Sequence, residues 1–304
     1  MDFYFGLLQI IGVHTLLGLP AYVVLLTGQL SMAQVGFFAI GTYVAGMGTV
    51  LWGLHIAPAL ALAGVVGALS AFVVGFPALR VKGLMLVVAT LAFSEIVRLG
   101  IFGFTYQVGR NGALIGPHGT NGFKQIRYFL ESGWSAAEVS LFIWAIVITV
   151  MAALWWMDRS RAGAVLRAVG ADETAAQSVG LSLTAVKVSA MTAGGFIAAI
   201  GGGLYAHVTT HVQSDMFNVL LATFAVAYPI LGGRSNVFGT LFAVLFIQGF
   251  LIEGLRFLGE WRNLLFGLLI LLIMNIRPDG ILDASALRRI LRLFGRGRQV
   301  HAPS

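Results

Sequence analysis

Long apolar stretches recur along the whole chain, and they constrain its fold more than any other feature. A helix that crosses the roughly 30 Å hydrocarbon core of a bilayer needs about 20 mostly apolar residues. Only 10% of the 304 residues are charged, against about 25% in soluble domains, so charged side chains are too few to cover a water-facing surface. We therefore predict an all-α, polytopic transmembrane helical bundle of about nine spans, within a range of eight to ten. The predicted spans are residues 3–26, 33–51, 57–79, 84–104, 137–157, 186–206, 218–231, 237–255 and 261–276.

The second and seventh spans differ from the others. The seventh is short, and both lie beside glycine-rich sequence. Irregular backbone at membrane depth must line a cavity or pack within protein, because lipid cannot satisfy its hydrogen-bonding groups. We predict that these two segments are re-entrant or broken helices.

Basic residues are unevenly divided between the two sides of the predicted membrane. If the residues after Ile276 are cytoplasmic and the spans alternate, 13 of the 19 Lys and Arg residues fall inside, 5 fall outside, and Arg98 lies within a span. Cytoplasmic loops carry an excess of Lys and Arg, which predicts an outside N-terminus and a cytoplasmic C-terminus. Residues 1–282 then form the transmembrane domain, and residues 283–304 form a basic cytoplasmic tail. Basic residues on the cytoplasmic side explain the net charge of +7. We therefore expect no nucleic-acid partner.

The N-terminus is apolar from Phe3 onward, with no basic region before it and no small-residue cleavage site. Secretory signal peptides carry both features. We therefore expect the first span to be retained.

Motifs for catalysis and cofactor binding are absent from the sequence. It contains no G-x-S-x-G, H-E-x-x-H or P-loop motif and no cysteine, so it offers neither a thiolate nor the usual ATP-binding loop. His207 and His211 have the i,i+4 spacing of a zinc pair, but Asp215 is the only nearby carboxylate, and polar residues at the end of a span explain them better. We expect a non-catalytic chain that binds no metal or cofactor and that obtains any ATP and Mg²⁺ chemistry from partners.

The inside loop of residues 158–187 is the most charged internal stretch. Residues 174–179 suit a helix that ends at Gly180, and Asp172 and Glu173 favour its N-terminus. A short cytoplasmic helix of this kind can dock in a cleft of another protein. An ordinary solvated connection between two spans is the alternative.

Glycines and uncharged polar residues before and within the second span are candidates for a translocation path. Glycine lets backbones approach closely or breaks a helix, and a broken helix exposes N–H and C=O groups that can hold the two ends of a zwitterion. Packed contacts between membrane helices use the same residue types, so both interpretations stay open. The candidates are Gly28, Gln29, Ser31, Gln34 and Gly36.

One acidic and one basic residue lie three positions apart in the fourth span. Glu95 and Arg98 share a helix face. Charge inside a membrane is costly, so the pair should neutralise itself or face the interior. Glu95 is therefore a further path candidate, and a structural ion pair is the alternative.

Small residues recur every four positions in the sixth span. Ala190, Gly194, Ala198 and Gly202 form one row, and Gly195, Ala199 and Gly203 form another. Small-xxx-small rows allow helices to pack closely in membranes. The pattern predicts a tight contact surface for a neighbouring subunit or for a moving gate.

Four segments of the chain resemble, in order, those of the branched-chain amino acid ABC transporter permease family, of the LivM type. GQLSMAQVGFFAIGTYVAGM at residues 28–47 is similar to the family's G-Q-x-S-x-x-x-x-x-F-x-x-x-G-A-Y segment. Residues 161–188 resemble its coupling segment, with E-x-A-A-x-x-x-G at residues 173–180. LGGRSNVFGTL at residues 231–241 and RPDGIL at residues 277–282 resemble its G-G-x-G-x-x-x-G-P turn and its closing R-P-x-G-L. Three positions depart from the family pattern, namely Ala164, Gly170 and Thr240.

The resemblance implies an ABC importer permease of the bacterial inner membrane that carries leucine, isoleucine and valine. It implies two cytoplasmic ATPase subunits, a homologous second permease of the LivH type and a periplasmic solute-binding protein as partners, within a lipid bilayer. A permease for urea or short amides, or a self-sufficient secondary transporter, is the alternative. By the same resemblance, the residues that couple to the ATPases are Asp172, Glu173, Ala175, Ala176, Gly180 and Leu181.

Overall fold

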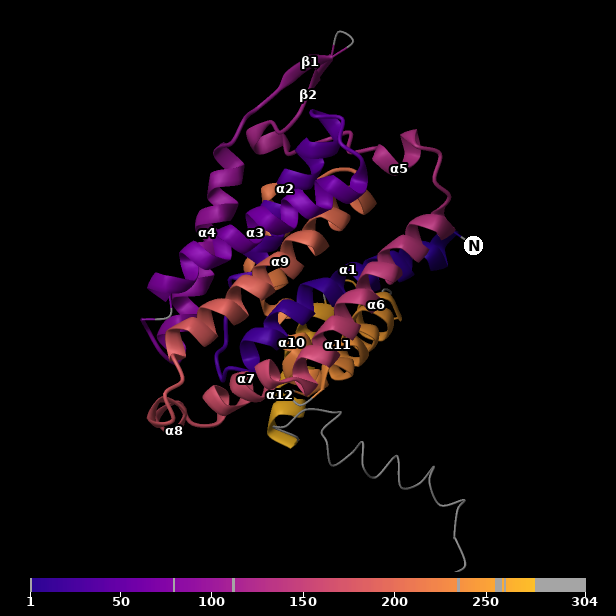
Figure 1. The fold of residues 1–304 in the computed structure, drawn as a ribbon. Helices are drawn as coiled ribbons and strands as arrows, with labels where there is room; N and C mark the ends of the chain where they lie inside the picture. The colour runs from indigo at the N-terminus through magenta and orange to yellow at the C-terminus, as the bar shows by residue number, and fades with distance from the viewer. Residues whose placement is uncertain are drawn as a thin grey trace, which may run out of the picture.

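The computed structural model describes residues 2–78, 80–110, 113–233, 236–254, 259 and 261–276. The predicted closing motif at 277–282 and the predicted tail at 283–304 lie outside these residues. All nine predicted apolar segments contain helix (Figure 1). Among the described residues, six helical stretches are long and apolar enough to cross a membrane. They are α1 (Asp2–Leu25), α3 (Ile56–Ala78), α4 (Leu84–Gly103), α6 (Ala136–Arg159), α9 (Leu183–Thr209) and the joined helices α11 (Val237–Val244) and η3 (Leu245–Gly254).

Three further apolar helices are shorter: α2 (Gln34–Val50), α10 (Val219–Gly232) and α12 (Trp261–Ile276). At 1.5 Å per residue, α2 and α10 reach only about 26 Å and 21 Å. Residues 29–32, before α2, have no regular secondary structure. Helices α2 and α10 are themselves continuous, so neither the second nor the seventh span is broken within its predicted bounds. The eighth span contains a π-helix, η3, which the sequence pattern did not indicate.

The two ends of the bundle carry different connections (Figure 1). At the hairpin end, β1 (Val108–Arg110) pairs antiparallel with β2 (Ala113–Ile115), followed by η1 (Gly119–Asn121) and α5 (Tyr128–Glu131). The opposite end, here called the α8 end, carries α7 (Arg161–Ala171) and α8 (Glu173–Ser178). The glycine-rich loop after α4 thus adds one small hairpin to the helices of the described residues.

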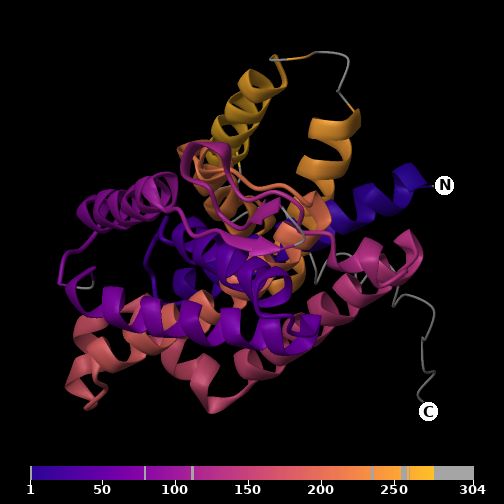
Figure 2. The same cartoon turned by 90° about the horizontal axis from the view of Figure 1, so that it is seen from above.

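Helix α9 is the centre of the larger packing unit and contacts α1, α2 and α3 along its length. The helices from α10 onward form a second apolar cluster with α1, and Figure 2 shows them gathered at one side, opposite α3 and α9. A Cβ on Gly202 would overlap the carbonyl oxygen of Phe38, and one on Gly41 would overlap that of Ala199. The predicted tight surface of the sixth span therefore packs against helices of the same chain.

Adding a methyl group at Gly202 should destabilise the protein because its Cβ would overlap the backbone of Phe38 in α2. We expect Gly202→Ala to lower the melting temperature of the detergent-solubilised chain, with a cost of about 1–3 kcal/mol. Gly100→Ala in α4 is the matched control, since its Cβ would meet nothing within 4 Å. Equal melting temperatures for the two variants would contradict the close contact of α2 and α9.

Candidate functional site

Helix α8 forms where the sequence places a cap at each end. The Asp172 carboxylate accepts hydrogen bonds from the backbone N–H groups of Thr174 (2.8 Å) and Ala175 (3.1 Å). Gly180, two residues beyond the helix, has a φ of +85°, a conformation that glycine adopts without strain. The helix predicted for residues 174–179 is thus found at Glu173–Ser178.

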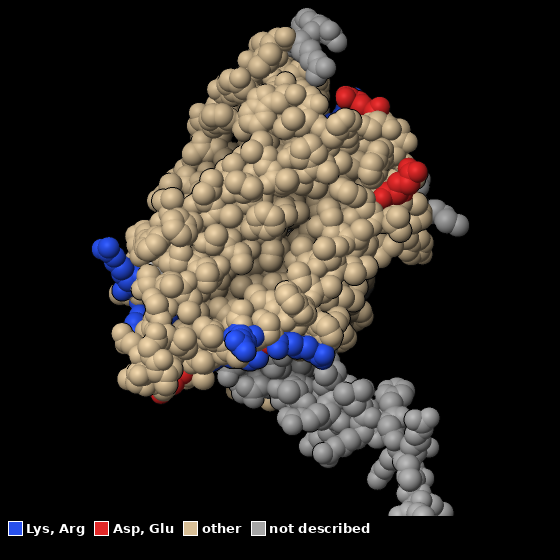
Figure 3. Space-filling model, viewed as in Figure 1, with Lys and Arg blue, Asp and Glu red and all other residues tan. Residues whose placement is uncertain are grey.

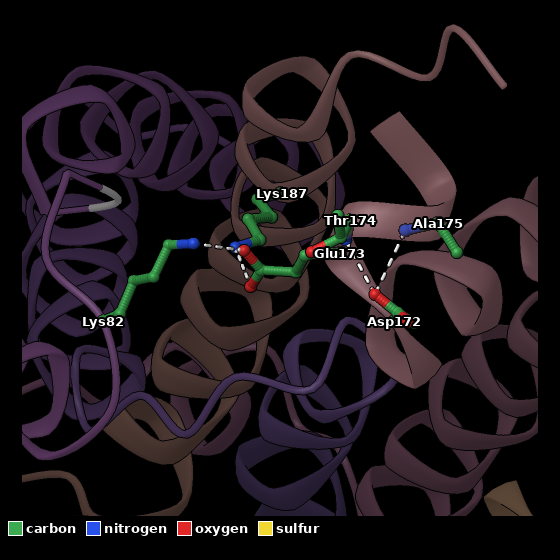
Figure 4. A network of polar contacts seen from close by, with 6 residues as sticks. All are labelled: Lys82, Asp172, Glu173, Thr174, Ala175 and Lys187. Atoms are coloured by element: carbon green, nitrogen blue, oxygen red, sulfur yellow. Dashed lines mark hydrogen bonds and ion pairs between the residues drawn. The ribbon is translucent and has the colours of Figure 1, made fainter. Parts of the chain in front are cut away.

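Glu173 joins α8 to the rest of the bundle through two ion pairs (Figure 4). Lys187 Nζ of α9 lies 2.6 Å from Glu173 Oε1, and Lys82 Nζ of the α3–α4 loop lies 2.7 Å from Oε2. The Lys187 side chain is only 4% exposed, whereas that of Lys82 is 71% exposed. The hydrogen bonds from Lys187 and Lys82 lower the pKa of the Glu173 carboxyl. One carboxylate therefore ties α8 to two other elements.

The six predicted coupling residues occupy different faces of this segment. Asp172, Ala175 and Gly180 are exposed, Glu173 and Leu181 are partly exposed, and Ala176 is buried. The exposed surface also includes Val179, whose apolar side chain is 75% exposed. Ala176 thus anchors α8 inward, while its neighbours leave a surface on which another protein can dock.

The last turn of α7 contacts the irregular segment of residues 27–33 through its backbone. Gly28 has a φ of +73°, and a Cβ on it would lie 3.0 Å from the carbonyl oxygen of Gly170. A Cβ on Gly170 would overlap the carbonyl oxygen of Leu26. These contacts account for glycine at position 170, one of the three positions that depart from the family pattern. The structure therefore brings the predicted coupling segment and the start of the predicted path together.

Helix α4 holds the backbone of the irregular segment in place. The N–H of Met32 donates to Thr90 Oγ1 (3.0 Å), and Ser94 Oγ donates to the carbonyl oxygen of Met32 (2.8 Å). Gly36 packs against the ring of Phe93, with room for no Cβ. The sequence analysis predicted no role for Thr90 and Ser94. Two polar residues four positions apart in an apolar span are the pattern that could have indicated one.

The glutamines of this region are buried without matching partners. Gln34 is fully buried, and neither its amide oxygen nor its amide nitrogen has a hydrogen-bond partner. Gln29 is 7% exposed, and its amide oxygen also lacks a partner. Ser31 differs, because its hydroxyl accepts a hydrogen bond from the N–H of Ala33 at 3.3 Å. Buried polar groups are usually hydrogen-bonded, so the unpaired amides of Gln29 and Gln34 are exceptional within the described residues.

Glu95 forms the predicted ion pair on α4. Arg98 Nε donates to Glu95 Oε2 at 2.7 Å, and Arg98 Nη1 lies 3.5 Å from Asp215 Oδ1 in η2 (Ser214–Phe217). The Glu95 side chain is 30% exposed. Glu95 lies beside Ser94, so it is close in sequence to the α4 residues that hold Met32.

His207 and His211 show no zinc-like arrangement in the described part of the chain. Nε2 of His207 lies 2.9 Å from Thr49 Oγ1, and its Nδ1 lies 2.6 Å from the carbonyl oxygen of Gly203. His207 therefore links α9 to α2.

Comparisons with known proteins agree with this architecture. The family described as "Branched-chain amino acid transport system / permease component" matches residues 3–274. The high-affinity branched-chain amino acid transport system permease protein LivM of Salmonella typhimurium is 31% identical over 297 residues, which cover 89% of this chain and 68% of that protein. LivM of Escherichia coli K12 is 30% identical over 294 residues, with the same coverage.

A relative named for a different substrate also matches. The fructose import permease protein FrcC of Rhizobium meliloti is 25% identical over 280 residues, which cover 89% of this chain and 76% of that protein. No solved structure matches the chain significantly. The family match over most of the chain, the helical bundle and the LivM relatives lead to one conclusion: the chain belongs to the branched-chain amino acid transport permease family and is a multi-pass, non-catalytic permease subunit of an ABC importer.

Proposed function

We propose that this permease subunit carries leucine, isoleucine and valine across the bacterial inner membrane. The observation that carries the proposal is the higher identity to the two LivM proteins than to the fructose permease, over the same share of the chain. The buried uncharged amides of Gln29 and Gln34 support it, because they can bind a zwitterion without placing a net charge in the bundle. The N-terminus lies outside and the C-terminus is cytoplasmic, as the excess of inside Lys and Arg predicts.

The proposed assembly contains a second, homologous permease, two cytoplasmic ATPases and a periplasmic solute-binding protein. The ATPases dock on the exposed surface of residues 172–181 and supply the ATP and Mg²⁺ chemistry. When they close on ATP, they displace α8. The displacement reaches α9 through Glu173 and Lys187 and reaches the irregular segment through Gly170 and Gly28. Substrate then meets a path that includes Gln29, Gln34 and Glu95.

Purification of the chain from its native membrane in mild detergent tests the assembly and the substrate together. We expect two P-loop ATPases and a second permease to co-purify, and the reconstituted complex to import leucine in an ATP-dependent manner. The solute is identified by competition among branched-chain amino acids, urea, short amides and fructose. Import of fructose but not leucine would refute the proposed substrate, and ATP-independent transport by the chain alone would refute the assembly.

Reversing the charge of Glu173 tests the coupling route. In Glu173→Arg, three cations meet where two ion pairs stood, so α8 should separate from α9. We expect ATP hydrolysis to continue while solute import falls at least about tenfold, the equivalent of 1.4 kcal/mol. Addition of Lys187→Glu should restore part of the import by recreating one ion pair. Glu131→Arg, an exposed change at the hairpin end, is the charge-matched control and should import normally.

The pH dependence of the same contact has a definite sign. The Glu173 carboxyl has a lowered pKa in the folded protein, so its ion pairs stabilise the fold above the unfolded-state pKa and are lost as the pH falls through the folded-state value. We expect the ratio of import to ATP hydrolysis to stay constant across neutral pH and to fall only in acid. A loss of coupling near pH 7 would assign the step to another group.

Replacing Gln34 separates a role in transport from a role in folding. Gln34→Leu removes a buried amide that has no partner, so the melting temperature should stay constant or rise, while leucine import should fall. Gln248→Leu is the matched control, since Gln248 Nε2 donates to Tyr228 Oη at 2.8 Å. Loss of this hydrogen bond should reduce the free energy of unfolding by about 1–3 kcal/mol and so lower the melting temperature. Normal import by Gln34→Leu would remove Gln34 from the path.

A further inference from the structure

Three polar side chains from three different helices meet inside the second apolar cluster. Oη of Tyr228 in α10 and Nε2 of Gln248 in η3 each lie 2.9 Å from Nδ1 of His14 in α1. Gln248 Nε2 also donates to Tyr228 Oη at 2.8 Å. Tyr228 and Gln248 are buried, and His14 is partly buried. One hydrogen-bond network therefore joins α1, α10 and η3, and no role described so far uses it.

The network lies at mid-depth in the bundle. His14 is near the middle of the 24-residue helix α1. On the face drawn in Figure 3, acidic and basic side chains lie toward the two ends of the bundle, and its middle shows none. Ionisable residues at such a depth are rare and usually have a function. Apolar side chains of similar shape would fill the space at no cost in unpaired polar groups, so packing alone does not explain the network.

Contacts on the two sides of α1 differ in kind. Toward α9, a Cβ on Gly194 would lie 3.2 Å from the backbone carbonyl oxygen of Pro20. Toward α10 and α11, a Cβ on Gly18 would lie 3.0 Å from side-chain atoms of Tyr228 and Thr240. Backbones in close contact hold two helices in one position, whereas side chains can change rotamer and let helices separate. Helix α1 can therefore stay with α9 while α10 and η3 shift.

Helices α10, α11 and η3 form one unit. A Cβ on Gly232 of α10 would overlap the carbonyl oxygen of Gly239 of α11, and a Cβ on Gly239 would overlap that of Gly232. Helix α11 continues directly into η3, so Gln248 belongs to the same unit. Outside the unit, α10 and α11 contact α1 more than any other helix. The network is thus a polar attachment between this unit and the helix that holds it.

We propose that His14, Tyr228 and Gln248 form a lock that holds the unit of α10, α11 and η3 on α1, and that the lock opens once in each transport cycle. The π-helix places a departure from α geometry at Gln248, where the unit must bend as it leaves α1. Because the network is either made or broken, it gives two discrete arrangements. The three side chains are positioning residues. The proposal rests on the ABC importer function and not on the identity of the solute.

Distances between spin labels test the lock in the assembled transporter. The chain has no cysteine, so Ile10→Cys in α1 and Phe250→Cys in η3, both exposed positions, can carry a label pair once the cysteines of the partner subunits are replaced. The complex is measured in nanodiscs by double electron–electron resonance, without nucleotide and with a non-hydrolysable ATP analogue. We expect a second distance to appear with the analogue. A pair at Ile10 and Phe196, across α1 and α9, should keep a single distance.

Variants distinguish a lock from a network that only supports the fold. His14→Leu should raise the population of the second distance without nucleotide about fivefold, the effect of one lost hydrogen bond. The triple variant His14→Leu, Tyr228→Phe and Gln248→Leu leaves no polar group unpaired, so its melting temperature should recover relative to His14→Leu while the second distance stays populated. Thr49→Val, which breaks the contact with His207, is the control and should leave the distance unchanged.

Three outcomes would overturn the proposal. A single distance between positions 10 and 250 in both nucleotide states of the wild type would mean that the unit stays on α1. The wild-type distance in the triple variant would mean that the network contributes to packing only. An equal shift in Thr49→Val would mean that the second distance reports a general loss of stability.

Discussion

Close contact between helix backbones around α9 is the constraint on which the rest of the structure depends. Lipid tails are as apolar as the helices, so association in a bilayer relies on van der Waals packing and hydrogen bonds rather than on the hydrophobic effect. Gly202 meets the carbonyl oxygen of Phe38, and Gly41 meets that of Ala199, with no room for a side chain. Helices packed in this way cannot slide past one another without opening a cavity. Helix α9 must therefore move together with α2 and α3.

Hydrogen bonding in the irregular segment shows which polar groups the fold satisfies. Unpaired backbone groups at membrane depth are costly, and Thr90 and Ser94 pair both backbone groups of Met32. The amide of Gln34 receives no such support. The fold thus fixes the backbone of the segment and leaves side-chain groups available. A rigid backbone that presents free amides is suited to a path for a polar solute.

Sequence reasoning succeeded where local chemistry decides the outcome. Apolar length predicted the helices, the Asp172 cap and Gly180 predicted α8, and the i,i+3 spacing predicted the Glu95–Arg98 pair. It failed where contacts join distant elements. Lys187 reaches Glu173 only because the chain turns back after α8, and Gly170 meets Gly28 only because α7 folds beneath the irregular segment. Neither contact has a spacing that a helix or strand period would reveal. The π-helix η3 likewise has no signature in the hydrophobic pattern.

Helix α9 is attached to other elements near both of its ends. Lys187 binds Glu173 at the α8 end, and His207 contacts Thr49 of α2 toward the hairpin end. The two residues are 20 positions apart, which corresponds to about 30 Å along the helix, the thickness of the hydrocarbon core. A helix held in this way transmits a displacement as a rigid body, so any change in shape must be taken up by less regular elements. The π-helix η3 in the eighth span supplies such an element, since mid-helix departures from α geometry often mark functional hinges. The bundle is therefore able to deform in the eighth span, while the backbone at the start of the predicted path stays fixed to α4.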